Sequence, residues 1–277
     1  MLRNIEELFT AIREPSADSI ERLAALDAGT PKIRYAICLI PRSGSTYLAY
    51  TLRDTKAFGF PDEWLSAARM QTEIDDLAAN DVATYLRRVL AKHASPNGVS
   101  GVEVAIAQVI AARKLAKIDD VLDGSVKYFY LRRRNIVRQG LSMHVAHQSG
   151  VLHSFQMNDD ARTVREAVMY DTQAIRQQIK VLHDQELMWE REFSSRHIEP
   201  DRIYYEDLIE RPERILRRFA NVLGLPETPL MPPQASIEDL GHSRRDEWEA
   251  RYREEDADYL EALKLHRPRV HISLSMT

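Results

Sequence analysis

The sequence predicts an α/β fold built on a central parallel sheet, and two observations support this class. Apolar runs are followed by polar turn residues and then by a helical pattern, and this order recurs along the chain. The strongest runs are continuous rather than alternating, as expected for strands that are covered on both faces. With 277 residues, of which 44% are hydrophobic, the chain can bury a core of this kind.

The expected elements follow one another along the chain. Residues 1–30 carry apolar residues at helical spacing, which predicts a helical N-terminal extension ahead of a single domain over residues 31–277. The apolar run 35–40 predicts the first buried strand, with a turn at 41–46. Further strands are expected at residues 99–104, 126–131 and 203–205. Helices are expected at residues 47–55, 67–95, 109–116, 135–146, 161–193 and 212–223.

Composition argues against several classes of protein. The 38 basic and 42 acidic residues give a net charge of −4, so the chain lacks the basic character of a nucleic-acid-binding protein. The single cysteine, Cys38, excludes an intrachain disulfide and lies in the first apolar run, where we interpret it as a buried structural thiol. We expect no membrane span and a cytoplasmic location, because no apolar run reaches transmembrane length and residues 1–9 lack an apolar signal core.

The turn Pro41–Thr46 has the composition of an anion-binding loop. It joins a buried strand to a helix, whose N-terminus offers unpaired backbone N–H groups. Gly44 allows a ligand to approach the backbone closely, and Arg42 adds a fixed charge. The alternative is a serine- and threonine-rich helix cap without a ligand. The loop lacks the lysine and the glycine spacing of a Walker A motif, which speaks against ordinary ATP γ-phosphate chemistry.

A second group of cations follows the strand at 126–131. Arg132, Arg133, Arg134 and Arg138 crowd its end, and Ser142 lies on the helix that follows. In a parallel sheet the loops after the strands converge on one ligand crevice, and guanidinium groups bind phosphate bidentately. A solvated basic surface is the alternative for any single arginine. Together with the loop at 41–46, the cluster favours a ligand that carries two anionic groups.

These segments resemble those of a known enzyme family. Leu39–Leu48 is similar to the 5′-phosphosulfate loop of sulfotransferases, and Leu131–Ser142 is similar to their 3′-phosphate segment. The variant resembles that of bacterial carbohydrate sulfotransferases of the Stf0 type. Three further stretches, at 59–63, 96–101 and 245–253, fit the same type in the same order.

The resemblance implies a P-loop-NTPase-like central parallel sheet with helices on both faces. It also implies the donor 3′-phosphoadenosine 5′-phosphosulfate (PAPS), a transferase without a metal, and a carbohydrate or glycolipid acceptor. Arg133 and Ser142 would hold the 3′-phosphate, with Arg132 or Arg134 as alternatives to Arg133, and Arg244 or Arg245 would close over the nucleotide. The residues implied for the 5′ side of the donor are Arg42, Ser43, Gly44, Ser45 and Thr46.

The resemblance also implies a general base and acceptor contacts. Glu63 occupies the position of the family's proposed base, and its neighbours Phe60 and Trp64 would partly desolvate it. Without the resemblance, the alternative is that Glu63 is an ordinary surface carboxylate. The residues implied at the acceptor are Gln108, His147 and Gln148. We predict no metal site for the histidines at 144, 147 and 153, because no carboxylate pattern accompanies them.

One position departs from the family pattern. Glu103 stands where relatives usually carry lysine, so acceptor recognition or the stabilisation of the leaving group is expected to differ. Three interpretations follow: a PAPS-dependent sulfotransferase, a kinase-like nucleotide enzyme, or a catalytically impaired nucleotide-binding or scaffold protein. Glu103 favours the third. The predicted long helix at 161–193 offers a surface for a homodimer.

Overall fold

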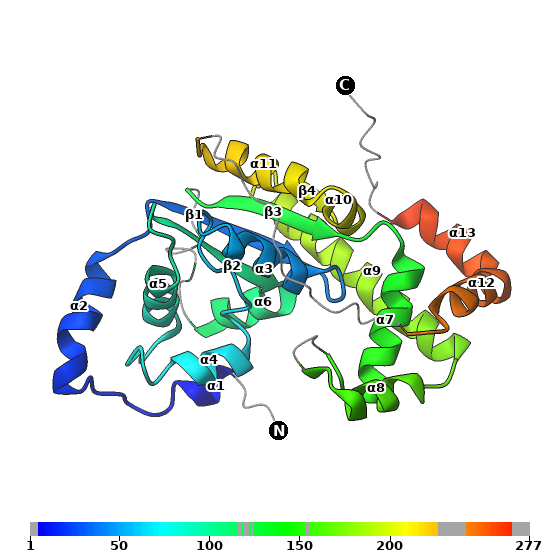
Figure 1. Cartoon of the computed structure of the whole chain (residues 1–277), viewed down its shortest axis with the longest axis horizontal. Coiled ribbons are helices and arrows are strands. Elements are labelled where there is room, and N and C mark those ends of the chain that lie inside the picture. The colour runs from blue at the N-terminus through cyan, green and yellow to red at the C-terminus, as the bar shows by residue number, and fades with distance from the viewer. Residues whose placement is uncertain are drawn as a thin grey trace.

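A four-stranded sheet forms the centre of the molecule. The computed structural model describes residues 5–115, 118, 122, 125–152, 156–226 and 242–267. All strand pairs of the sheet are parallel, and the strand order is β2-β1-β3-β4 (Figure 1). The strands are β1 (Ile33–Leu39), β2 (Val99–Ala105), β3 (Lys127–Arg132) and β4 (Asp201–Tyr204). The predicted α/β class with a parallel sheet is confirmed.

The register brings the carboxyl ends of the strands to one edge. Leu39 lies opposite both Ala105 on β2 and Leu131 on β3, and Arg132 lies opposite Tyr204 on β4. The segments that leave these strands therefore begin side by side. This edge is where open parallel sheets bind ligands.

Helices cover both faces of the sheet, because successive side chains of a strand point to opposite sides. On β1, Ala36 and Cys38 pack on one face, whereas Tyr35 and Ile37 pack on the other. The first face is covered by α4 (Ala67–Glu73), α5 (Val82–Lys92), α6 (Ile106–Leu115) and part of α9 (Thr172–Ser195). The second is covered by α3 (Ser45–Asp54), α10 (Tyr205–Glu210) and α11 (Pro212–Leu223).

Two further groups of helices extend the sheet layers. The N-terminal group consists of α1 (Ile5–Leu8), the short 3₁₀ helix η1 (Ala17–Ser19) and α2 (Ile20–Ala28), which pack on α4, α5 and α6. In the other group, α7 (Ile136–Ser149), α12 (Arg245–Glu255) and α13 (Ala257–His266) pack around α9 through a separate apolar cluster, and α8 (Asp159–Glu166) packs on α7. Figure 1 shows this group beside the carboxyl edge of the sheet.

The structure corrects three boundaries predicted from the sequence. Residues 67–95 form α4 and α5 rather than one helical stretch, because Asp81 caps a new helix through the Thr84 amide. The predicted helix 161–193 is divided between α8 and α9, because Asp171 caps α9 through the Ala174 amide. Tyr205 begins α10 instead of ending a strand. Capping side chains interrupt an amphipathic pattern that continues across each break.

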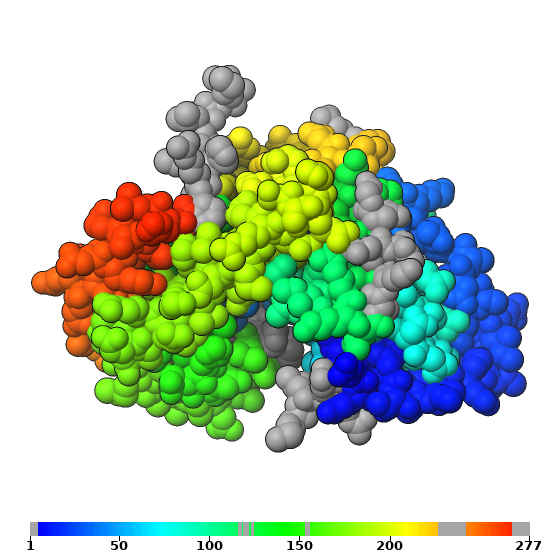
Figure 2. Space-filling model, turned by 180° about the vertical axis from the view of Figure 1, so that it is seen from behind, coloured from blue at the N-terminus to red at the C-terminus, as the bar shows by residue number. Residues whose placement is uncertain are grey.

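The helix α9 has one buried and one outward face. Its inner residues include Ile175, Ile179 and Leu182, which are buried, while its other side runs as a ridge across the back of the molecule (Figure 2). The homodimer suggested for this region stays a prediction. None of the helices in the described part of the chain combines the length and apolar character needed to cross a membrane.

Candidate active site

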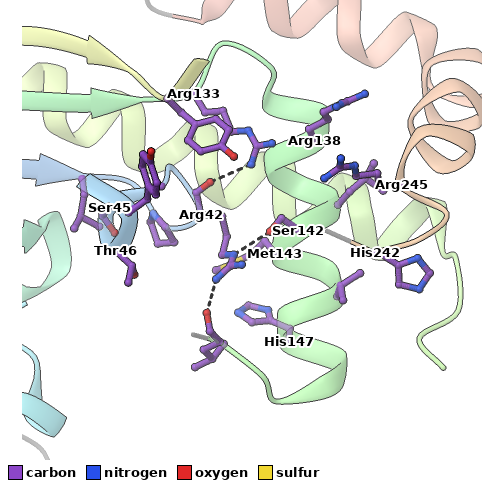
Figure 3. Close-up of a pocket in the computed structure, with 18 of the residues that line it drawn as sticks. Arg42, Ser45, Thr46, Arg133, Arg138, Ser142, Met143, His147, His242 and Arg245 are labelled. Carbon is purple, nitrogen blue, oxygen red and sulfur yellow. Dashed lines mark hydrogen bonds between the residues drawn. The ribbon is translucent and has the colours of Figure 1, made fainter. Parts of the chain in front are cut away.

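A cavity of about 520 Å³ opens at the carboxyl edge of the sheet. Its wall combines the loop after β1, the end of β3, the inner side of α7 and the start of α12 (Figure 3). Most of the predicted site residues meet here. Those that line the cavity are Arg42, Gly44, Ser45, Thr46, Glu63, Arg133, Ser142, His147 and Arg245.

The loop after β1 turns sharply enough that it requires glycine. Gly44 has a φ of 87°, in the left-handed region that glycine adopts without strain. A Cβ atom at Gly44 would also lie 2.3 Å from the Tyr205 ring. The turn starts α3 at Ser45, so that the helix N-terminus borders the cavity. This geometry suits an anion-binding site formed by backbone N–H groups and the helix dipole.

Ser43 differs from its neighbours in the loop. Its side chain is fully buried and does not line the cavity, and its Oγ has no hydrogen-bond partner in the described part of the chain. The structure therefore puts Ser43 beneath the loop, whereas Ser45 and Thr46 face the cavity.

The Arg42 side chain crosses the cavity to α7. Its Nε donates to Ser142 Oγ at 3.0 Å, and its Nη1 donates to the Leu152 carbonyl at 2.5 Å (Figure 3). Burial lowers the pKa of Arg42 to about 10, and the nearby charges of Arg165 and Arg133 act in the same direction. Arg42 thus links the loop to Ser142, the residue implied for the 3′-phosphate.

The three arginines after β3 have three different surroundings. Arg132 is fully buried and forms an ion pair with Glu186 at 3.1 Å. Arg134 binds the Asp207 carboxylate through both terminal nitrogens, each at 2.7 Å. Arg133 lines the cavity, where its guanidinium lies 4.5 Å from the Tyr205 ring centroid. Of these three arginines, Arg133 is the one whose side chain lines the cavity.

The two arginines before Trp248 also differ. Arg245 lines the cavity. Arg244 does not; it pairs with Glu247 at 2.5 Å on the outer side of α12. Arg138, a cation of the cluster after β3, lines the cavity and pairs with Asp246 at 2.7 Å. Of the two nucleotide-closing candidates, Arg245 is the one at the cavity.

Glu63 borders the cavity, and Gln108 holds its carboxylate in place. Gln108 Nε2 donates to Glu63 Oε2 at 2.7 Å, and Gln108 Oε1 accepts from the Ala105 amide at 2.8 Å. Burial raises the pKa of Glu63, the Gln108 hydrogen bond opposes part of that rise, and the charge of Asp62 adds to it. The carboxylate is thus desolvated and held in one orientation, as a general base requires.

The remaining acceptor candidates are dispersed. His147 lines the cavity from α7, but Gln148 is exposed and lies outside its wall. Gln108 contacts Glu63 rather than the cavity.

Two further histidines lie near His147 in the sequence. His144 is buried, with Nε2 2.9 Å from the Met169 carbonyl oxygen, and His153 lies outside the described residues. Across the described ranges, no group of three or more histidine, cysteine or acidic side chains has metal-binding geometry.

Not every residue of the cavity wall was assigned to the site from the sequence, and Tyr205 and Arg165 are two of those that were missed. Tyr205 supplies the ring that packs against Gly44 and Arg133, and Arg165 reaches the cavity from α8. A tyrosine at a strand end and one arginine in a charged amphipathic helix resemble many surface residues. The aromatic residue after β4 could have been found, since the carboxyl ends of all strands were expected to converge.

Glu103 is buried beneath Glu63. Its side chain is 3% exposed, its amide donates to the Asp62 carbonyl at 2.9 Å, and its Oε1 has no partner in the described part of the chain. Burial raises the pKa of Glu103 well above its ordinary value, and the charges of Glu63 and Asp62 raise it further. The buried position favours a neutral carboxylic acid at this site.

A family profile and two relatives agree with the resemblance. The profile of the Stf0 sulphotransferase family matches residues 34–255. The chain is 28% identical to a trehalose 2-sulfotransferase of Mycobacterium tuberculosis, over 80% of this chain and 94% of that protein. It is 26% identical to a trehalose 2-sulfotransferase of Mycolicibacterium smegmatis, over 79% and 94%. A structural match to the sulfotransferase STF9 from Mycobacterium avium has a TM-score of 0.47 at 12% identity, covering 93% of this chain and 74% of that one.

Replacing Glu103 by glutamine should make the protein more stable at neutral pH. An acid whose pKa rises on folding contributes its full stability below the unfolded pKa, near 4.5, and loses it as the pH rises toward the folded pKa. Glutamine has no such proton to lose. Thermal melting of Glu103→Gln should therefore match the parent near pH 4.5 and exceed it at pH 8, by roughly 2–4 °C per kcal/mol gained.

The exposed Glu254→Gln serves as the control and should leave both curves unchanged. A Glu103→Gln variant that is less stable than the parent at pH 8 would show that Glu103 is stabilised as a carboxylate.

Proposed function

Because the chain belongs to the Stf0 sulphotransferase family, we propose that it transfers a sulfuryl group from PAPS to a hydroxyl of a carbohydrate or glycolipid acceptor. The observation that carries the proposal is the convergence of an anion-binding loop, Arg133 with Ser142, and a desolvated Glu63 on one cavity. The two trehalose 2-sulfotransferases among its relatives support a sugar acceptor. A cytoplasmic location remains a prediction.

The two anionic parts of PAPS would occupy two parts of the cavity. The backbone at Gly44, Ser45 and Thr46 would hold the 5′-phosphosulfate at the start of α3. Arg133 and Ser142 would hold the 3′-phosphate, and Arg245 would close over the nucleotide from α12. Guanidinium groups suit such phosphates because they offer paired N–H donors and stay charged.

Glu63 would remove the acceptor proton during transfer. As Glu63 takes the proton, the acceptor oxygen forms a bond to sulfur, and the bond between sulfur and the bridging phosphate oxygen breaks. That oxygen leaves with the bonding electrons as part of 3′-phosphoadenosine 5′-phosphate (PAP). Backbone N–H groups of the loop at the start of α3 would stabilise the phosphate as its negative charge grows.

A catalytically impaired nucleotide-binding protein is the second candidate, and Glu103 is the observation that favours it. The resemblance implies a lysine at this position, where the chain has a buried acid next to the proposed base. If Glu103 is neutral, as its burial favours, it leaves the charge of Glu63 intact and permits catalysis. PAP binding without transfer to any acceptor would favour this second candidate.

The donor proposal predicts selective binding of PAP over ATP. Two separated anion sites match the 3′- and 5′-phosphates of PAP, whereas ATP carries all its phosphates on one side. Titration calorimetry should show clearly tighter binding of PAP than of ATP.

Arg133→Ala should weaken PAP binding by roughly 10- to 100-fold, the effect of one charge-assisted contact.

The exposed Arg214→Ala on α11 should bind PAP as the parent does. Equal affinities of the parent for ATP and PAP would overturn the donor assignment.

Glu63→Gln tests the general base. The change preserves volume and an acceptor for Gln108, so PAP binding should stay nearly intact while kcat falls by roughly 10²–10⁴-fold. The parent should lose activity as the pH falls through the raised pKa of Glu63, because the protonated acid cannot accept the substrate proton. The variant's residual rate should lack this acidic limb.

Steady-state kinetics between pH 5 and pH 9, with Glu254→Gln as the matched control, measure both effects. Full turnover of Glu63→Gln across this range would exclude Glu63 as the base, and Asp62 would be the next candidate.

A further inference from the structure

Arg165 reaches the cavity from a helix that has no assigned part in the site. It lies on α8, is 3% exposed, and forms part of the cavity wall. Its Nη1 donates to the Val151 carbonyl at 3.0 Å. The neighbouring carbonyl, that of Leu152, accepts from Arg42 at 2.5 Å. Two arginines from distant parts of the sequence therefore hold adjacent carbonyls of the segment after α7.

Arg165, Arg42 and Arg133 form a concentrated positive region. The charges of Arg165 and Arg133 both act on the Arg42 guanidinium, and that of Arg165 acts more strongly. Among the described residues that line the cavity, Glu63 is the one carboxylate, and it is held by Gln108. Like charges at short range in a buried site destabilise one another, and a bound dianion would relieve that repulsion.

Ser142 locates this region within the cavity. Arg42 Nε donates to Ser142 Oγ, the hydroxyl proposed for the 3′-phosphate, at 3.0 Å, and the charge of Arg165 acts on the same Arg42 guanidinium. The Arg133 Nη1 also lies 3.4 Å from the Arg42 carbonyl oxygen. Arg42 therefore contacts Ser142 through its side chain and Arg133 through its backbone, and Arg165 lines the same cavity.

The residue after Arg165 fixes α8 from the other side. Glu166 Oε1 accepts from the Ser243 amide at 3.1 Å, and its Oε2 accepts from the Ser243 hydroxyl. His242, next to Ser243, stacks on Trp248 with ring centroids 4.4 Å apart. The helix α8 is therefore held by the segment that leads into α12, and Arg165 is positioned before any ligand binds.

We propose that Arg165 is a donor-specificity residue that, together with Arg42, binds the 3′-phosphate of the nucleotide and so selects 3′-phosphorylated donors. The inference rests on the proposed function, since it assumes that PAPS is the donor. A phosphate carried by the acceptor is the other source of the same chemistry. The hydrogen bond from Arg42 to Ser142 favours the nucleotide, and the experiment separates the two sources.

The test compares the affinities for PAP and for adenosine 5′-monophosphate, which differ by the 3′-phosphate alone. Arg165→Gln removes the charge but keeps an N–H donor for the Val151 carbonyl. By titration calorimetry it should weaken PAP binding by roughly 10- to 100-fold and change the binding of adenosine 5′-monophosphate by less than about twofold. Arg162→Gln, on the exposed side of the same helix, should leave both affinities unchanged.

A second variant guards against a purely structural effect. Arg165→Lys keeps the charge and should retain most of the preference for PAP. Unchanged PAP binding by Arg165→Gln would overturn the inference, as would an equal loss for both nucleotides or a change confined to the acceptor KM. A parent protein that does not prefer PAP would instead refute the donor assignment itself.

Discussion

The parallel pairing of β1 with strands on both sides is the constraint on which the site depends. With Leu39 opposite both Ala105 and Leu131, the chain must leave all three strands at one edge of the sheet. The loop that follows β1 then turns through Gly44, where the Tyr205 ring leaves no room for a side chain. The cavity is a consequence of this register, and helices on both faces hold it in place.

The cavity separates two kinds of chemistry. Arginines lie toward α7 and the end of β3, where they suit the phosphates of a nucleotide, while Glu63 lies toward β2. Coulomb attraction between a cation and the base would lower the pKa of Glu63, whereas burial raises it. Arg69, which pairs with Asp62 at 2.7 Å, has the first effect on Glu63, and burial is the larger of the two.

Much of this arrangement could be predicted from residues close together in the sequence. The continuous apolar runs predicted all four strands to within about two residues, and the glycine-containing polar turn after β1 predicted a loop that does border the cavity. The divisions at 67–95 and 161–193 were missed because capping by Asp81 and Asp171 interrupts patterns that look continuous. Arg165 could not have been found, because its place in the wall depends on how α8 packs against the segment after α7.

Transfer of radiolabelled sulfate from PAPS to a panel of sugars and glycolipids tests the central claim most directly. If the cavity performs direct in-line transfer, label should enter a carbohydrate hydroxyl, one PAP should form for each sulfate transferred, and both should depend on the acceptor. The account would be contradicted if PAP formed at the same rate without any acceptor, or if the label accumulated on the protein.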